Sequence, residues 1–463
     1  GFLSMSKTKS NRKGKAVQNA GQTAPDAGKR KFLLLGLGGA GALAVAGIGY
    51  GAGWFGSSAP TPAGPVIAPT PKLATGKPLP PVTLTANYQN ALAAANDLTS
   101  FYARELNNAS TLIHAVRAFG KNFKLNDGSL AVDFLCSRFA AEKEINGKRY
   151  VYFTRDAEVH EFSFLKTMLE AGVSPDQPVT VGGNKYTLRD VGESAKMLFR
   201  CDQKNFDRYE ANYLGRHMPW ALISFSILVP PAQSTWTNAY GETINLPEII
   251  DTSLAVLNGL CEDVQTTSAR GELESLEFRK GLKKFSCDGM HSVYGYYSCL
   301  KHGYTQNNMQ ERMNKLTDNV LLRLREDSLA IDREADAVKS MGPDFITRLA
   351  QEDQGGKVTT KGAPPAALAE VMRFRFQIRM LGHAMEALNY AKLHKLIKLT
   401  PAQEGKLRAG EQLLYDYLVK LRATDLQPYM NWHDKFVSET VIALAHAARG
   451  MKLLTSDNPD TVA

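Results

Sequence analysis

The chain has 463 residues, of which 44% are hydrophobic and 22% are charged, as in ordinary globular proteins. This composition excludes a wholly disordered, collagen-like or coiled-coil chain, and five cysteines in this length exclude a disulfide-built scaffold. The net charge of +9 is concentrated in residues 1–31, which hold eight basic groups and one acid, so the nearly neutral remainder does not indicate nucleic-acid binding.

The N-terminal segment predicts a membrane-anchored protein. Residues 1–31 are polar and basic, which predicts a disordered tail. The next 24 residues, 32–55, carry no charge and are long enough as a helix to cross a hydrocarbon core of about 30 Å. Because the basic cluster stands only on the N-terminal side, we expect the tail in the cytoplasm and the rest of the chain outside. Residues 32–55 therefore predict a single transmembrane helix or an uncleaved signal anchor.

An export signal is the alternative for the same segment. The sequence Lys29-Arg30-Lys31-Phe32-Leu33 resembles a twin-arginine signal in which lysine replaces the first arginine.

Eight of the 21 prolines then fall between Pro60 and Pro81. This density predicts a semi-rigid polyproline linker over residues 56–85.

Residues 86–463 predict one large, mainly α-helical domain. Apolar residues recur every three to four positions, as on amphipathic helices. The expected helical faces lie at 88–106, 109–119, 129–140, 162–171, 188–201, 207–228, 247–261, 289–302, 307–338, 365–396, 401–422 and 435–453. Two small β-hairpins are expected, one turning at Asn146-Gly147 and one at Gly182-Gly183. We expect the helices to pair in sequence into α/α hairpins that build a solenoid or a closed toroid.

The start of the helix expected at 289–302 carries candidate functional residues. Asp288 is expected to cap this helix and to place His291 inward, with Tyr294 on the same face. Zinc binding is one hypothesis for this segment, with Cys287, Asp288 and His291 as ligands and Cys261 or His383 as a further ligand. The alternative is a buried histidine that orients a neighbouring segment. Metal and cofactor identity stay open.

His383 and Glu386 share one helix face and are a ligand pair, an acid–base pair or a local hydrogen bond. A histidine and a tyrosine, such as His291 and Tyr294, can act as base and acid at C5 of a uronic acid. The candidate catalytic residues are therefore His291, Tyr294, His383 and Glu386. Cys287 and Cys299 are not expected to form a disulfide, because a helix would separate them by about 18 Å.

Four segments resemble an uncharacterised family of exported, membrane-anchored bacterial proteins. They are His160–Leu165, Trp236–Glu242, Cys287–Tyr294 and Leu381–Glu386. The resemblance covers roughly residues 100–400 and implies an α/α architecture similar to terpenoid-cyclase and prenyltransferase toroids. It also implies a bacterial cell membrane, with the helical domain in the periplasm or outside the cell. Asp288-x-x-His291 is similar to the zinc-carrying helix of protein prenyltransferases.

Two functions follow from these patterns. The first is a membrane-tethered envelope protein with a structural or protein-interaction role, since no strong catalytic motif occurs. The alternative is an enzyme acting on polysaccharide, a lyase or a glycosidase, centred on His291. A cleft containing His291, Tyr294 and His383 would favour the enzyme, and closed apolar packing around them would favour the scaffold. The expected partners are the membrane, through residues 32–55, and an envelope protein or polysaccharide, with no nucleic acid.

Overall fold

The computed structural model describes residues 78–456, except 156, 159, 202–213, 216, 271–281, 283, 284 and 354–363. All of these described residues belong to one compact unit. The expected tail, the apolar segment 32–55 and most of the proline-rich linker lie outside the described residues. Within the part of the chain that is described, no helix has both the length and the apolar character needed to span a membrane.

The described residues are mainly helical, as the periodicity predicts. The α-helices are α2 (Tyr88–Leu106), α3 (Ala109–Phe119), α4 (Ala131–Arg138), α5 (Ser163–Glu170), α6 (Leu188–Leu198), α8 (Met218–Leu228), α9 (Leu246–Ala269), α10 (Met290–Lys301), α11 (Met309–Ser340), α12 (Pro343–Asp353), α13 (Leu368–Leu393), α14 (Pro401–Arg422), α15 (Gln427–Trp432) and α16 (Asp434–Thr455). Local signals set several of their ends. The side chains of Asn87 and Asn108 cap α2 and α3, and Thr400 and Gln403 form a capping box at α14.

Three two-stranded antiparallel hairpins accompany the helices. Strands β1 (Ala140–Ile145) and β2 (Lys148–Phe153) turn at Asn146-Gly147, and β3 (Pro178–Val181) and β4 (Asn184–Thr187) turn at Gly182-Gly183. All four turn residues have positive φ, as such tight turns require. Both predicted hairpins are confirmed. The third, β5 (Thr235–Thr237) with β6 (Thr243–Asn245), was not predicted, because three-residue strands show no readable alternation.

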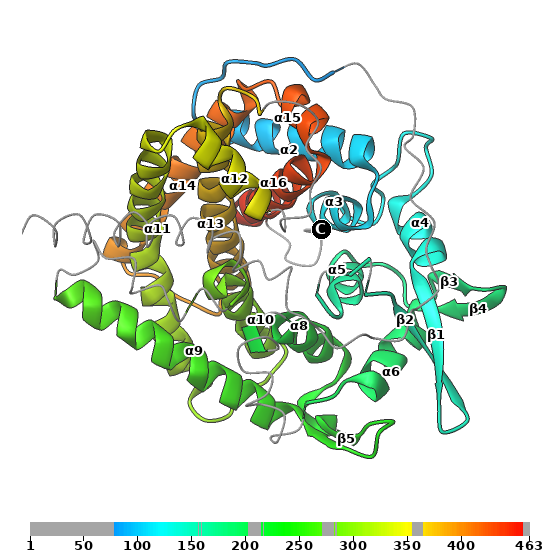
Figure 1. The fold of residues 1–463 in the computed structure, drawn as a ribbon. Coiled ribbons are helices and arrows are strands. Elements are labelled where there is room, and N and C mark those ends of the chain that lie inside the picture. The colour runs from blue at the N-terminus through cyan, green and yellow to red at the C-terminus, as the bar shows by residue number, and fades with distance from the viewer. Residues whose placement is uncertain are drawn as a thin grey trace, which may run out of the picture. The chain divides into compact units, whose positions relative to one another are not determined.

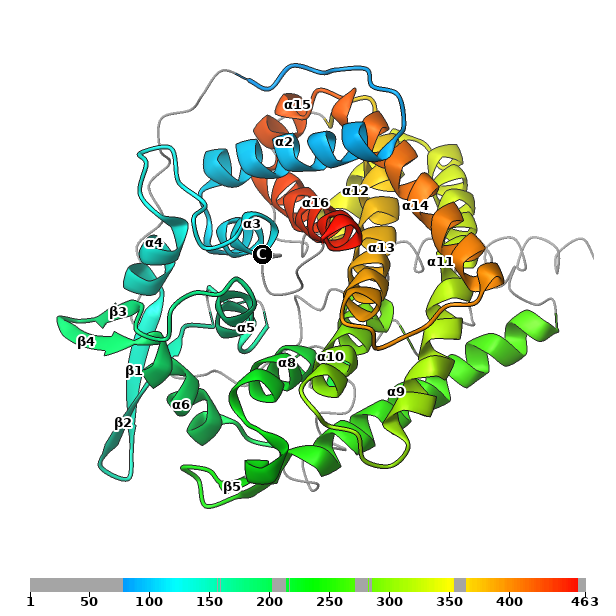
Figure 2. The same ribbon diagram turned by 180° about the vertical axis from the view of Figure 1, so that it is seen from behind.

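The helices alternate along the chain between an inner and an outer position (Figure 1). Figure 2 shows α3, α5, α8, α10, α13 and α16 around the centre, with α2, α4, α6, α9, α11 and α14 outside them. Each inner helix contacts the next one along the chain, and α16 contacts α3, so the inner helices close into a ring. The hairpins lie beside α4 and α6, away from this centre.

Inner helices α13 and α16 approach closely, and glycine makes this possible. A β-carbon at Gly382 of α13 would lie 3.0 Å from the backbone nitrogen of Ala447 on α16. A β-carbon at Gly450 of α16 would lie only 2.7 Å from the backbone nitrogen of Glu386 on α13. The Asn389 side chain also donates a hydrogen bond of 2.9 Å to the Gly450 carbonyl. This contact sets the distance between the side chains that the two helices send into the ring.

The end of the proline-rich segment is fixed to the helical domain. The backbone N–H of Val82 donates to the carbonyl of Arg422 on α14 at 3.1 Å, and the Arg422 guanidinium donates to the Pro80 carbonyl. The helical domain therefore includes residues that precede α2.

Candidate active site

Four inner helices carry the same spacing, a histidine followed three residues later by another polar side chain. The pairs are His114 and Arg117 on α3, His291 and Tyr294 on α10, His383 and Glu386 on α13, and His446 and Arg449 on α16. Residues three apart lie on one helix face one turn apart. The pairs consequently build two layers inside the ring, one of histidines and one of charged and phenolic groups. Helix α5 adds Lys166 and Glu170 to the second layer.

The histidine layer is a set of rings in direct contact. The Nε2 atoms of His383 and His291 lie 3.0 Å apart. The His383 ring stacks on the ring of His446, with centroids 3.8 Å apart, and the His446 and His114 centroids are 5.3 Å apart. The layer continues outward from His291 to Trp220 of α8, at 4.4 Å between centroids.

Cys287 belongs to this layer. Its Sγ lies 3.4 Å from the Nε2 of His383. Cys287 and Asp288 both have left-handed backbone conformations, with φ of 50° and 51°, and Gly289 follows with φ of 85°. Helix α10 starts after this turn, with Gly289 as its N-cap and no side-chain cap. The prediction that Asp288 caps the helix is therefore wrong, because Asp288 stands one residue too early and lacks the extended conformation of a capping residue.

The second layer is a buried ion-pair network. Arg117 bonds Glu386 at 2.7 Å and also contacts Glu170. Lys166 lies 2.9 Å from Glu170, and Arg449 lies 3.1 Å from Glu386. These three cations therefore share two carboxylates inside the ring.

Tyr294 lies inside this network. Its hydroxyl donates a hydrogen bond to Glu170. The cationic groups of Arg117, Lys166 and Arg449 stand 5.1 to 5.5 Å from its ring centroid. Tyr294 is 3% exposed, so these contacts replace water around the phenol.

One hydrogen bond joins the two layers. The Nδ1 of His446 and the Oε2 of Glu386 lie 2.7 Å apart. The other ring nitrogen of His446, Nε2, is buried and has no hydrogen-bond partner among the described residues. A buried polar atom without a partner calls for an explanation, such as a catalytic role or a bound water or ion.

Burial lowers the pKa values of the histidines in this centre and raises the pKa of Tyr294. Burial, followed by the neighbouring histidines, holds the pKa of His291 and of His446 well below the ordinary value. Burial also lowers the pKa of His383 to about 3, so all three imidazoles are neutral near pH 7. Burial raises the pKa of Tyr294 well above its ordinary value, so the phenol keeps its proton.

The charged residues are perturbed as well. Burial alone would raise the pKa of Glu386, but the charge of Arg117, the hydrogen bond from His446 and the charge of Arg449 outweigh it and hold this pKa well below its usual range. Burial, followed by the charge of Arg117, lowers the pKa of Lys166 to about 7. The network thus has more cationic groups than carboxylates, and Lys166 is the cation that loses its proton most readily.

The structure brings together all four residues that the sequence singled out, His291, Tyr294, His383 and Glu386. Of the two candidate further ligands, His383 joins Cys287 and His291, and their ligand atoms all lie within 4.8 Å of one another. Cys261 lies on outer helix α9 and is not part of this group. Cys287 and Cys299 are both free thiols, as expected.

Sequence reasoning missed most of the second layer and part of the histidine layer. The missed residues are Arg117, Lys166, Glu170, His446 and Arg449. The signal that was available is the repeated spacing of a histidine and a polar residue three positions later. Neither residue of such a pair stands out alone in the sequence. Only the recurrence of the spacing on several helices indicates a common centre.

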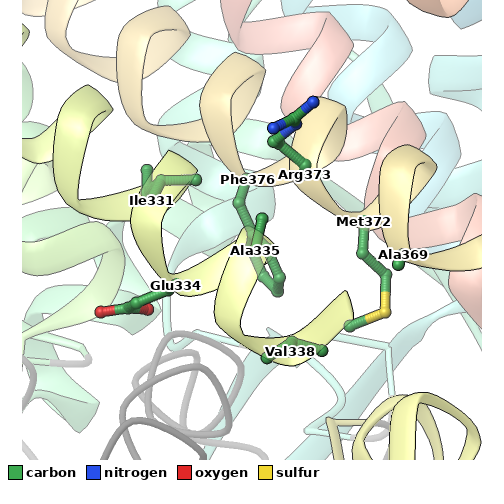
Figure 3. A pocket seen from close by; sticks show the side chains of 8 residues that line it. All are labelled: Ile331, Glu334, Ala335, Val338, Ala369, Met372, Arg373 and Phe376. Atoms are coloured by element: carbon green, nitrogen blue, oxygen red, sulfur yellow. The ribbon is translucent and has the colours of Figure 1, made fainter. Parts of the chain in front are cut away.

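A separate crevice lies between α11 and α13 (Figure 3). Its lining is mainly apolar, with Glu334 and Arg373 as the charged members. None of its lining residues belongs to the two layers, so it does not extend the site.

Scans against protein-family models, curated proteins and solved structures return no match for this chain. The candidate function therefore rests on the site itself.

Proposed function

We propose that the helical domain is an acid–base enzyme of α/α toroid architecture, with its active centre inside the ring of inner helices. The alternation of inner and outer helices and the return of α16 to α3 support the toroid. The observation that carries the enzyme is His446. Its Nδ1 is hydrogen-bonded to a buried carboxylate, while its neutral Nε2 keeps a lone pair with no partner among the described residues. A carboxylate that orients a histidine in this way is a recurrent arrangement for a general base.

Tyr294 supplies the matching acid once its hydroxyl turns from Glu170 to the substrate. Its raised pKa keeps the proton on the phenol, whereas the lowered pKa of His446 keeps that imidazole unprotonated. Two titratable groups whose environments push their pKa values apart are suited to act as acid and base. His291 is less suited to be the base than the sequence suggested, because its Nε2 is already in contact with His383.

A purely structural role explains this centre less well. Burying ion pairs costs desolvation free energy, and apolar side chains of similar volume often stabilise a core as well or better. The contacts around Tyr294 and Glu386 are ionic, not the closed apolar packing expected of a scaffold. Clusters of strongly perturbed pKa values are typical of functional sites.

The excess of cations favours an anionic substrate, and we propose a polysaccharide that contains uronic acid. Its carboxylate would balance the one positive charge that is left when Arg117, protonated Lys166 and Arg449 share the carboxylates of Glu170 and Glu386. In the elimination, His446 takes the C5 proton, the bond between C4 and the leaving oxygen breaks, and Tyr294 protonates that oxygen. His446 gains one proton and Tyr294 loses one, so the protons balance, and a C4–C5 double bond remains in the product.

A row of side chains in contact links the histidine layer to the surface of the domain. Arg155 is exposed and lies 3.4 Å from the half-buried His217 at the start of α8. His160 lies 5.9 Å from His217 and stacks on Trp220 at 3.8 Å between centroids. Trp220 contacts His291, so polar and aromatic groups lead from the surface to the histidine layer.

The charge pattern of residues 1–55 supports the proposal that this domain is tethered to a bacterial cell membrane and lies on its outer side. A reporter fused after residue 85 is then expected to be active only outside the cytoplasm. Activity of that reporter in the cytoplasm would contradict the tether without affecting the proposed chemistry.

The experiment for catalysis incubates the purified full chain with uronate-containing and neutral polysaccharides. An elimination produces new reducing ends together with ultraviolet absorbance from the double bond, whereas hydrolysis produces reducing ends alone. We expect His446→Gln and Tyr294→Phe to lower the rate by about 100-fold or more. The matched control is Tyr297→Phe, on the same helix, whose hydroxyl bonds Thr317 outside the site. Full activity of Tyr294→Phe, or no turnover of any polymer by the wild type, would restore the structural and interaction role.

A further inference from the structure

We propose that Cys287, His291 and His383 bind one Zn²⁺ ion through Sγ and the two Nε2 atoms. The inference does not depend on the proposed elimination, because His446 and Tyr294 are not among the ligands. Thiolate and imidazole are the ligands that Zn²⁺ most often takes in proteins.

Two of the three ligand-atom spacings are close to those of a tetrahedral zinc site, and all three atoms lie within 4.8 Å of one another. With Zn–N near 2.0–2.1 Å and Zn–S near 2.3 Å, two nitrogen ligands stand about 3.3 Å apart and a nitrogen and a sulfur about 3.6 Å apart. The corresponding distances are 3.0 Å between His383 and His291 and 3.4 Å between His383 and Cys287. Outward movement of the side chains by a few tenths of an ångström would therefore admit the ion.

The tautomer of His383 is set for metal binding. Its Nδ1 lies 2.6 Å from the carbonyl oxygen of Arg379, which can only accept a hydrogen bond. The proton of the neutral ring is thus on Nδ1, and the lone pair of Nε2 faces His291 and Cys287. Metal-bound histidines usually donate their other ring N–H to a carbonyl or a carboxylate in this manner.

The backbone before α10 holds the thiol in place. Cys287 and Asp288 are both left-handed, a conformation that residues other than glycine rarely adopt in succession. The guanidinium of Arg323 donates to the Asp288 carbonyl at 2.9 Å and pairs with Asp327 at 2.9 Å. Unfavourable backbone conformations held by their surroundings occur often at functional sites.

Three protein ligands leave the fourth zinc position for water or substrate, as in catalytic zinc sites. His446 is the nearest further candidate, since its ring stacks on His383 and its Nε2 has no partner among the described residues. The compact set of ligand atoms includes Cys287, His291 and His383 but not His446. Zinc binding takes the proton of the Cys287 thiol, which passes to solvent.

The test uses purified full-length protein that has been stripped with a chelator and then titrated with Zn²⁺ alone or Co²⁺ alone. We expect one ion per chain and, with Co²⁺, a thiolate-to-metal charge-transfer band with the strong visible bands of tetrahedral coordination. Cys287→Ser should abolish the charge-transfer band, and His383→Gln should weaken Zn²⁺ binding by about 100-fold or more. Cys299→Ser is the matched control, because this thiol is buried in α10, the helix that carries His291, and its loss should leave both unchanged.

The outcomes separate this inference from the proposed catalysis. Substoichiometric zinc in the wild type, or a charge-transfer band that survives in Cys287→Ser, overturns the zinc site. Zinc retained at wild-type affinity in both His291→Gln and His383→Gln also overturns it. Circular dichroism of each variant checks that the fold is intact, and His446→Gln should still bind zinc while losing polysaccharide cleavage.

Discussion

Gly450→Ala tests whether the close contact of α13 and α16 holds the two layers together. The added methyl carbon would lie 2.7 Å from the backbone nitrogen of Glu386 and 3.1 Å from its Cα. Non-bonded heavy atoms prefer about 3.5 Å, so one helix must move by about 0.8 Å. The clash is with backbone, which cannot rotate away as the end of a flexible side chain could.

Two opposing effects determine how Gly450→Ala changes the free energy of unfolding. Overpacking a core costs about 1–3 kcal/mol, and a backbone clash belongs at the upper end of that range. Alanine in a helix interior recovers about 1 kcal/mol relative to glycine. We therefore expect Gly450→Ala to lower the free energy of unfolding by about 2 kcal/mol, and to loosen the hydrogen bond between His446 and Glu386.

Gly405→Ala is the matched control for this change. Gly405 lies in α14, and a β-carbon there would meet no atom within 4 Å. The same substitution should here raise the free energy of unfolding by about 0.5–1 kcal/mol. Chemical denaturation of the three proteins measures both effects. An unfolding free energy for Gly450→Ala equal to or above that of Gly405→Ala would refute the close packing of α13 and α16.

Two further predictions concern buried charges outside the proposed zinc ligands. Burial raises the pKa of Glu158, which accepts the Phe164 N–H, to about 8, so the folded protein holds this proton while the unfolded chain releases it near pH 4.5. The stability that protonated Glu158 contributes is therefore fully present below pH 4.5 and is lost as pH rises toward about 8. Within that range, Glu158→Gln should remove about 1.4 kcal/mol per pH unit from the pH dependence of the unfolding free energy. Denaturation at several pH values measures this change. Arg323→Ala removes the guanidinium beside the buried Asp327 carboxylate and should lower the free energy of unfolding by about 3–5 kcal/mol. The double variant Arg323→Met with Asp327→Leu leaves no unpaired charge and should recover much of that loss. Equal stability of the single and the double variant would contradict this prediction.

The fold was largely predictable because its signals are local. Hydrophobic spacing of three to four marks each long helix, and the range expected at 401–422 agrees with α14. The six-residue helix α15 and the β5–β6 hairpin were missed because so few residues show no period. Helix α12 was also missed, although it has 11 residues, as many as the predicted α3. The Asp288 cap was wrong because the left-handed turn at Cys287 and Asp288 depends on tertiary contacts such as the hydrogen bond from Arg323.

The site was only partly predictable, because its contacts are not local. His383 and Glu386 are visible as a pair on one helix, but Arg117, which bonds Glu386, is 269 residues away in sequence. Periodicity shows that Arg117 lies on a helix, and composition alone would place such a charge in water. Only the ring, which brings α3 beside α16 and α16 beside α13, explains why it is buried.

The ring of inner helices also sets an order of events during folding. Its last member, α16, ends near residue 455 and fills the space beside α2, α3 and α13. The Tyr88 hydroxyl at the start of the domain donates to the carbonyl of Met451, 363 residues later. Contacts of such sequence separation are slow to form. Until synthesis reaches α16, Glu386 lacks both His446 and Arg449, and the faces of α2, α3 and α13 that it will cover remain exposed. A chain released before that point would expose apolar surface and be prone to aggregate.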